Sequence, residues 1–421
     1  MLKIVFFSIP LFGHVNYGLK LAKALCDNKH KVRYYSGKAY ERFINDKGVD
    51  FYAYNEEIEE LFSETNSSYS AEYMLSVEPE DVDYVSEIYK YSYHLHEIER
   101  SFIEQQSGEI EAFNPDIIVY DSAAIWGKRI AQLLSIPCIC SCTPYSYPKE
   151  LIYKDPEMFS SLVFHQKMSG DITLKTLKKM NALLKKKFLL SDEMPISENW
   201  CGAGDLNLLY TVKDFQLGSR FFDEDKNVFC GILIDKDDKS DVSKFVSNNG
   251  RKLVYISFGT IYNSFRLLSE TAETLKPLHD FDFILNIGAH NDYKLFEGLP
   301  KNWKVVRRVP QISLLEKVDV FISHGGVNSV REAAHYGVPM VIVPWEGDTL
   351  CAAQDIINGN YGKAIDPSEI YRLKNVLVDV VNDSTVKDNC TELSRKMKNA
   401  GGLVYAVKMI EKIGEVGKQY E

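Results

Sequence analysis

The sequence predicts an α/β protein of two domains, each built on a parallel sheet. Short apolar runs alternate with segments of helical periodicity, which is typical of strands joined by crossover helices. This alternation occurs twice along 421 residues, a length that fits two domains. Between the two series, residues 214–250 contain the charged runs FDEDKN and DKDDKSD, which are typical of an exposed connection between domains.

The expected strands are short apolar runs rich in Val, Ile, Phe and Tyr. In the first half of the chain they cover residues 3–9, 31–35, 117–120, 137–141 and 206–210. In the second half they cover residues 253–258, 281–287, 303–306, 320–323 and 340–343. Apolar residues at helical spacing also predict a helix in the C-terminal tail. The resulting division is an N-terminal domain at 1–213, a connection at 214–250, a C-terminal domain at 251–390 and a tail helix at 391–421.

Composition excludes several classes of function. The formal net charge of −10 and the pI near 5.5 argue against a nucleic-acid-binding surface, which needs clustered positive charge. The 8 cysteines lack paired CxxC spacing and are expected to be reduced, buried thiols. The apolar run at residues 1–15 is broken by proline and glycine, so it is a first strand and not an export signal. Because no apolar run approaches the ~20 residues of a membrane span, a cytoplasmic protein is expected.

The segment FISHGGVNSVREAAHYGVPMVIVPW, residues 321–345, joins a buried strand to a helix start and then to a second strand. The first N–H groups of such a helix have no partner within the helix, and its positive dipole end suits a phosphate group. His324, Asn328 and Ser329 add side-chain donors, and Glu332 can accept hydrogen bonds from ribose hydroxyls. The segment therefore indicates a diphosphate site, with an ordinary strand-to-helix turn as the alternative.

Two polar residues follow apolar strands in the first half, His14 after the first strand and Asp121 after the strand IIVYD. Open α/β sheets bind ligands at the carboxyl ends of their strands. A carboxylate there can fix the tautomer of an imidazole that acts as a general base. The sequence thus permits a His14–Asp121 dyad, with a helix cap for Asp121 and a loop position for His14 as the alternatives.

The residues match a known family at several places along the chain. The pieces are FGHVN at 12–16, Asp121, ISFGT at 256–260, VPQ at 309–311, and HGGVNSVRE with GVPMVIVPWEGD from His324 to Asp348. In this order they resemble the family 1 nucleotide-sugar glycosyltransferases of the two-domain GT-B fold. Among these, the bacterial macrolide and antibiotic branch is the most similar. The resemblance implies two Rossmann-like domains that face each other across a cleft, with the tail helix crossing back to the first domain.

The resemblance also implies roles for individual residues. His14 matches the catalytic base, and Asp121 matches its supporting carboxylate. The donor-binding positions that it implies are Gly13, Thr260, Arg308, Val309, Gln311, His324, Gly325, Gly326, Asn328, Ser329, Glu332, Trp345, Asp348 and Thr349. Aromatic side chains that could line an apolar acceptor site are Phe12, Tyr69, Tyr73, Tyr89 and Tyr145. The alternative for tyrosines at helical spacing is that they cover the core.

Two positions depart from the family pattern. Thr349 stands where relatives usually have Gln and makes fewer hydrogen bonds to a sugar ring, so glucose is not assured as the donor sugar. Arg308 stands where many relatives place an aromatic residue that stacks on the base, which leaves the base open.

The expected activity is a metal-independent, inverting hexosyl transfer from a nucleotide sugar to a hydroxyl group of a small, largely apolar acceptor such as a polyketide, macrolide, flavonoid or lipid. A UDP-sugar is favoured as the co-substrate over a dTDP-deoxysugar, and no cofactor is expected. Two other classes stay open: an epimerase on the same fold, and a non-catalytic nucleotide-sugar-binding partner protein. The chain is expected to be a monomer or a homodimer. The basic amphipathic stretch at 174–190 could contact an anionic membrane, with a solvated helix face as the alternative.

Overall fold

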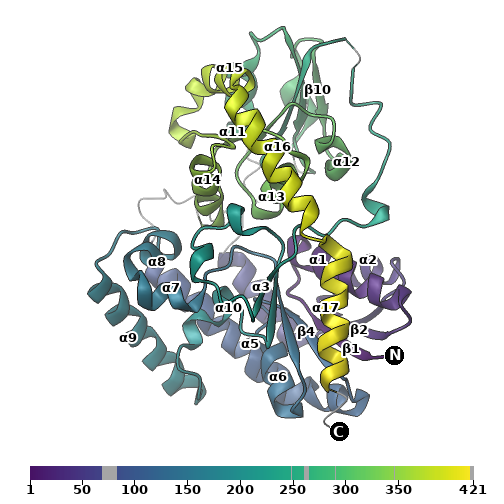
Figure 1. Cartoon of the computed structure of the whole chain (residues 1–421), viewed down its shortest axis with the longest axis vertical. Helices are drawn as coiled ribbons and strands as arrows, with labels where there is room; N and C mark the ends of the chain where they lie inside the picture. Colours follow the sequence, from purple (N-terminus) through teal and green to yellow (C-terminus); the bar gives the residue numbers. More distant parts are fainter. Residues whose placement is uncertain (69–82, 248, 260–264, 290, 346, 418–421) are drawn as a thin grey trace.

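The structure is a computed structural model, which describes residues 1–68, 83–247, 249–259, 265–289, 291–345 and 347–417. Two sheets occupy the lower and upper halves of the molecule in Figure 1. The first sheet has the strand order β3-β2-β1-β4-β5-β6-β7 and the second the order β10-β9-β8-β11-β12-β13. Neighbouring strands pair in parallel in both sheets.

The strands of the first sheet are short. They are β1 (Lys3–Phe7), β2 (Lys31–Ser36), β3 (Asp50–Ala53), β4 (Ile117–Asp121), β5 (Cys138–Cys142), β6 (Leu206–Leu209) and β7 (Asn227–Phe229). The second sheet contains β8 (Lys252–Ser257), β9 (Phe281–Asn286), β10 (Trp303–Val306), β11 (Val320–Ser323), β12 (Met340–Ile342) and β13 (Gly362–Ala364). The ten strands expected from the sequence are all present, and β3, β7 and β13 are additional. Since β7 belongs to the first sheet, the expected connection at 214–250 is corrected: its first part completes the N-terminal sheet.

Helices follow most strands. In the N-terminal half they are α1 (Phe12–Asp27), α2 (Glu41–Asn45), α3 (Glu56–Ser68), α5 (Tyr84–Phe113), α6 (Trp126–Leu134), α7 (Lys149–Lys154), α8 (Pro156–Val163), α9 (Gly170–Phe188) and α10 (Glu198–Cys201). In the C-terminal half they are α11 (Phe265–Leu275), α12 (Gln311–Leu315), α13 (Val327–Tyr336), α14 (Asp348–Asn358), α15 (Leu373–Asn382), α16 (Ser384–Asn399) and α17 (Gly402–Gly417). None of the described helices combines the length and the apolar character that a membrane span requires.

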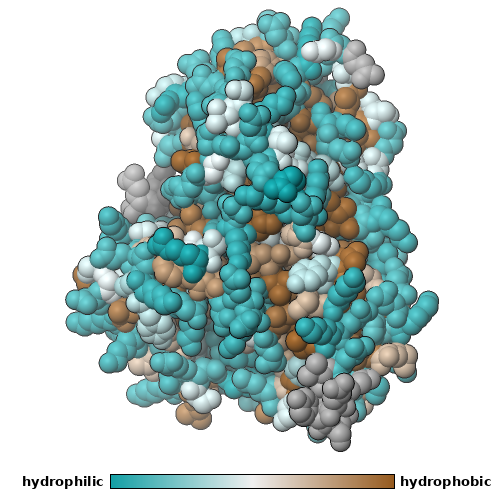
Figure 2. Space-filling view, in the orientation of Figure 1, coloured by the Kyte–Doolittle hydropathy of each residue, from teal (hydrophilic) through white to brown (hydrophobic). Residues whose placement is uncertain are grey.

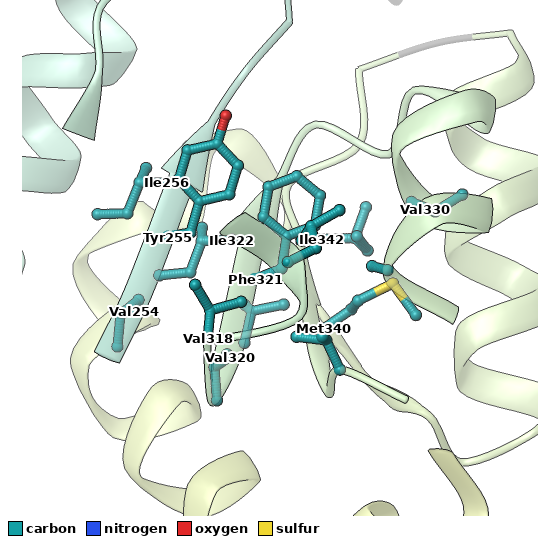
Figure 3. Close-up of a cluster of buried hydrophobic side chains, with 14 of the residues drawn as sticks. Val254, Tyr255, Ile256, Val318, Val320, Phe321, Ile322, Val330, Met340 and Ile342 are labelled. Carbon is teal, nitrogen blue, oxygen red and sulfur yellow. The ribbon is translucent and has the colours of Figure 1, made fainter. Parts of the chain in front are cut away.

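Both faces of each sheet are covered, which explains why the strands read as continuous apolar runs. Successive residues of β1 point to opposite faces: Ile4 and Phe6 join one apolar cluster, while Val5 and Phe7 join another. In the second sheet, side chains of β8, β11 and β12 pack together with Val330 of α13 (Figure 3). The eight cysteines are free thiols, and most of them are buried.

The C-terminal tail connects the two domains. Helix α16 lies on the upper domain, and α17 runs down along the lower one (Figure 1). The bend between them falls at Gly401 and Gly402, whose φ angles are 92° and 53°. Ala406 and Ile410 of α17 pack in the same apolar cluster as Ile4. The tail thereby covers one face of the N-terminal sheet.

Candidate active site

The clearest polar pair in the N-terminal domain joins His14 to Asp121. His14 lies in the first turn of α1, just after β1, and Asp121 is the last residue of β4. Because β1 and β4 are neighbouring parallel strands, their carboxyl ends reach the same edge of the sheet. The His14 Nδ1 atom lies 2.8 Å from Oδ2 and 2.9 Å from Oδ1 of Asp121. The Asp121 Oδ1 atom also accepts a hydrogen bond from the Ala123 N–H at 3.0 Å, so the carboxylate caps the following turn as well.

The surroundings of His14 favour its protonated form. Burial by itself acts to lower the pKa of His14, but the charge and hydrogen bond of Asp121 and the charge of Asp348 together raise this pKa above 6.5. The carboxylate is 3% exposed and the imidazole 18% exposed. With Nδ1 donating to Asp121, the Nε2 atom of neutral His14 carries the lone pair that can accept a proton.

The turn between β11 and α13 faces this pair from the other domain. Gly325 has a φ of 94°, and α13 begins after Gly326 without a side-chain cap. The Asn328 Nδ2 atom donates to the Gly13 carbonyl oxygen at 3.4 Å, so the first turn of α13 lies next to the first turn of α1. The helix start expected to hold a diphosphate is therefore beside the residue expected to act as the base.

His324 is enclosed by two glycines. A Cβ atom on Gly326 would lie 2.7 Å from His324 Nε2, and one on Gly259 would lie 2.6 Å from its Cε1. Only glycine leaves room for the ring between the turn after β8 and the turn after β11. Burial lowers the pKa of His324 to about 4, so at neutral pH this imidazole is uncharged and can act only as a neutral hydrogen-bonding group.

Three expected donor-binding residues form one hydrogen-bonded cluster. The Gln311 Nε2 atom donates to Ser329 Oγ at 3.0 Å and to Glu332 Oε2 at 2.8 Å. The Tyr255 hydroxyl donates to Gln311 Oε1 at 3.0 Å and orients the amide. Burial raises the pKa of Glu332. The structure thus brings together side chains from α12 and α13 that the resemblance placed on the ribose and phosphate side of the donor.

The first turn of α14 and the residue Trp345 before it supply the next group of expected residues. Asp348 is the first residue of α14, and its Oδ2 atom accepts a hydrogen bond from the Tyr145 N–H of the other domain at 2.9 Å. Thr349 is 5% exposed, and its Oγ1 atom accepts from the Trp345 N–H at 3.0 Å. The Thr349 hydroxyl is therefore used within the protein, where it links the start of α14 to Trp345.

The remaining expected residues are more scattered. Arg308 is exposed after β10, and Val309 is partly buried. Phe12 is 47% exposed and lies near Phe43, with ring centroids 5.7 Å apart. Tyr89 on α5 is half-buried beside Tyr93. Thr260, Tyr69 and Tyr73 lie outside the described residues.

Sequence reasoning missed the contacts that hold the two domains together. The Arg331 Nη1 atom donates to the Thr143 carbonyl oxygen at 3.0 Å. The Tyr145 hydroxyl donates to Asp355 Oδ2 at 2.7 Å, so Tyr145, which is 3% exposed, lies in the domain interface and not on an open acceptor surface. One signal was available: Asp348 and Asp355 are two helical turns apart, which places both on one face of α14.

The buried carboxyl group of Asp355 makes folding stability depend on pH. Burial raises the pKa of Asp355 to about 7, although the Tyr145 hydrogen bond and the Arg331 charge act in the opposite direction. This folded-state pKa is above the ordinary 3.8. The protonated Asp355 carboxyl group therefore contributes its full stabilisation of the fold below pH 3.8, and this stabilisation is lost as pH rises towards about 7. The free energy of unfolding that it contributes should fall by about 1.4 kcal/mol per pH unit in this window.

Asp355→Asn should remove this dependence, because the amide stays neutral at every pH. Denaturant unfolding of both proteins between pH 4 and pH 8 measures the difference between their free energies of unfolding at each pH. The other carboxyl groups are common to both proteins, so their effects cancel in this difference. Parallel curves for the two proteins would mean that Asp355 is ionised in the folded state at neutral pH.

Two parallel-sheet domains of this order, with a His–Asp pair on one beside an uncapped helix start on the other, have the arrangement of the GT-B fold. Comparison with known proteins agrees. Residues 272–402 match the family model for the C-terminal domain of erythromycin biosynthesis protein CIII-like proteins. The chain is 26% identical to the NDP-glycosyltransferase YjiC of Bacillus subtilis (strain 168) over 410 residues, covering 96% of this chain and 95% of that protein.

Two further comparisons extend this result. The chain is 24% identical to the demethyllactenocin mycarosyltransferase of Streptomyces fradiae, covering 98% of this chain and 86% of that protein. The crystal structure of the calicheamicin glycosyltransferase CalG4 superposes with a TM-score of 0.75 at 19% identity, covering 98% of each chain. The resemblance and the fold predicted from the sequence are confirmed, and the chain is a homologue of the natural-product glycosyltransferases.

Proposed function

We propose that this chain transfers a sugar from a nucleotide-sugar donor to a hydroxyl group of a small, largely apolar acceptor, with inversion at the anomeric carbon. The observation that carries this proposal is the His14–Asp121 pair, 2.8 Å apart, beside the uncapped start of α13. An imidazole on one domain thus faces a helix N-terminus on the other. Both groups are needed when a hydroxyl is activated and a diphosphate leaves.

In this mechanism His14 Nε2 takes the proton of the acceptor hydroxyl while the oxygen attacks the anomeric carbon. The bond from that carbon to the diphosphate oxygen breaks, and its electron pair leaves with the nucleoside diphosphate. Asp121 stabilises the imidazolium that forms, as its carboxylate does for the charged His14 in the free protein. One displacement gives one inversion.

The departing nucleoside diphosphate gains one negative charge as the bond breaks, and hydrogen-bond donors of the C-terminal domain can stabilise that charge. The first N–H groups of α13 point to its N-terminal end, and Ser329 and the neutral His324 lie in the same turn region. Stabilisation of developing charge by fixed donors is usually the largest catalytic contribution. We therefore propose that neither a metal nor a cofactor takes part.

Donor choice is the finer part of the proposal, and a UDP-sugar is favoured over a dTDP-sugar. A ligand that binds only the folded state raises its stability by about 2.7 kcal/mol at a concentration of one hundred times Kd. We expect UDP and UDP-sugars to raise the melting temperature more than dTDP and its sugars do. We also expect a chelator to leave both the shift and the transfer rate unchanged.

Thermal unfolding with the two nucleotide series, each with and without a chelator, measures this preference. Ser329→Ala is the matched variant, because it removes one donor near the start of α13 and should reduce the shift for every nucleotide. A larger shift with dTDP would reverse the assigned base. The absence of any shift would remove the nucleotide site from the β11–α13 turn.

A further inference from the structure

Helix α9 presents an unusual outer surface. It lies at the outer margin of the N-terminal domain (Figure 1), where it packs against α8 and α5. Its inner face is anchored, because Leu177, Met180 and Leu184 are buried in an apolar cluster with Phe159 and Ile196. The helix is therefore a firm part of the domain, and its opposite face is free to meet a partner.

The outer face of α9 is strongly basic. The helix carries six lysines, at positions 175, 178, 179, 185, 186 and 187, against a single acidic residue, Asp171, in its first turn. Within the described part of the chain, no ion pair involves any of these lysines. The whole chain has a formal net charge of −10, so this positive charge is segregated on one helix of an acidic protein.

Aliphatic side chains project among these lysines. Ile172 is 55% exposed and Leu183 is 46% exposed. Spacings of three and four residues align Ile172, Lys175, Lys179, Leu183 and Lys186 along one side of the helix. In Figure 2 the region of α9 is mainly hydrophilic, with isolated hydrophobic residues between the polar ones.

The C-terminal end of α9 adds a third aliphatic tip. Leu189 follows the three consecutive lysines in the left-handed conformation, with a φ of 56°, and is 90% exposed. No other large apolar side chain in the described part of the chain is as exposed. Exposure of a leucine side chain to water is unfavourable, and this free-energy cost is removed when the side chain enters the apolar edge of a lipid bilayer.

We propose that the outer face of α9, defined by Ile172, Lys175, Lys179, Leu183 and Lys186, docks on an anionic lipid bilayer together with the exposed Leu189 just after the helix. Lysine ammonium groups approach the headgroup phosphates while their methylene stems lie against the acyl boundary. The aliphatic tips enter the interfacial layer of the bilayer, where they contact apolar acyl chains. An acidic protein surface has no such apolar layer. None of these residues belongs to the candidate active site, so docking is separable from the transfer chemistry.

The first test is flotation of the full chain with vesicles of phosphatidylcholine alone or of phosphatidylcholine mixed with phosphatidylglycerol. We expect binding to the mixed vesicles only, weakened by added salt. Lys179→Gln with Lys186→Gln should lower the partition coefficient by about 30-fold, since each lysine near an anionic surface contributes about fivefold. The matched control is Lys408→Gln with Lys412→Gln, two exposed lysines on α17, which should bind as the unmodified chain does.

The second test separates a membrane from an acidic protein. Leu183→Asn with Leu189→Asn removes two of the three aliphatic tips and keeps every lysine, and it should lower vesicle binding at least about tenfold. Both side chains are largely outside the core, so the thermal midpoint should stay unchanged. Binding that survives this change while the lysine variant fails would identify an ionic site for an acidic macromolecule and overturn the proposal. Failure of the unmodified chain to bind mixed vesicles, or equal losses in the α17 control, would overturn it too.

Discussion

Replacing His14 with alanine should lower the transfer rate by about 10²–10⁴-fold, the usual contribution of a general base. The variant lacks the Nε2 atom that would take the proton of the acceptor hydroxyl. Nucleotide binding should stay nearly intact, because the expected diphosphate contacts lie in the C-terminal domain. Steady-state kinetics, together with thermal shift by UDP, measures both properties.

His14→Asn provides the matched control. An asparagine Nδ2 atom can occupy the place of the imidazole Nδ1 atom and keep the hydrogen bond to Asp121, which accepts at 2.8 Å in the unmodified chain. It cannot accept a proton at neutral pH. Equal losses in the alanine and asparagine variants would therefore assign the effect to proton transfer. An alanine variant that turns over at the original rate would exclude His14 as the base and would favour a binding protein or another chemistry.

The second large effect is expected from Asp121→Asn. Loss of a carboxylate that fixes the tautomer of a catalytic histidine costs up to about 10⁴-fold in rate. Donor affinity should change little. The result specific to this role is a change in the pH profile of kcat/KM. The value of kcat/KM should rise with pH as His14 loses its proton and the neutral base forms.

The charge and hydrogen bond of Asp121 help to raise the pKa of His14 above 6.5, so the rising limb should lie above that pH in the unmodified chain. Without the charge, burial dominates, and the limb should move to lower pH while the plateau falls. Asp116→Asn is the control. Asp116 lies at the opposite end of β4, where its Oδ2 atom accepts from the Lys3 N–H, and its loss should leave the limb in place. An unmoved limb in Asp121→Asn would reject its role beside His14.

Most strands could be predicted because their signal is local. Residues of β4 and β5 are buried on both faces, so each strand is a continuous apolar run. The strands that were missed, β3, β7 and β13, are three or four residues long and carry only a few apolar positions. They are held as strands by hydrogen bonds to a neighbour, which a window of sequence does not contain.

The candidate site divides in the same way. His14 and Asp121 were predicted because each follows an apolar strand, and parallel topology brings such residues to one edge. Gln311, Ser329 and Glu332 belong to separate motifs in the sequence and lie together in the structure. Arg331 could not be predicted as an interface residue, since its acceptor is a carbonyl group 188 residues away.

By itself, the sequence determined the order of strands and helices, the glycine turn before α13 and the identity of the polar residues at the strand ends. These features follow from periodicity and backbone stereochemistry over a few residues. Only the tertiary structure decided how the two domains meet, which hydroxyl reaches Asp355, and in which direction the pKa values of His14 and His324 move. Burial and long-range charge set those properties, and both depend on atoms that are distant in the chain.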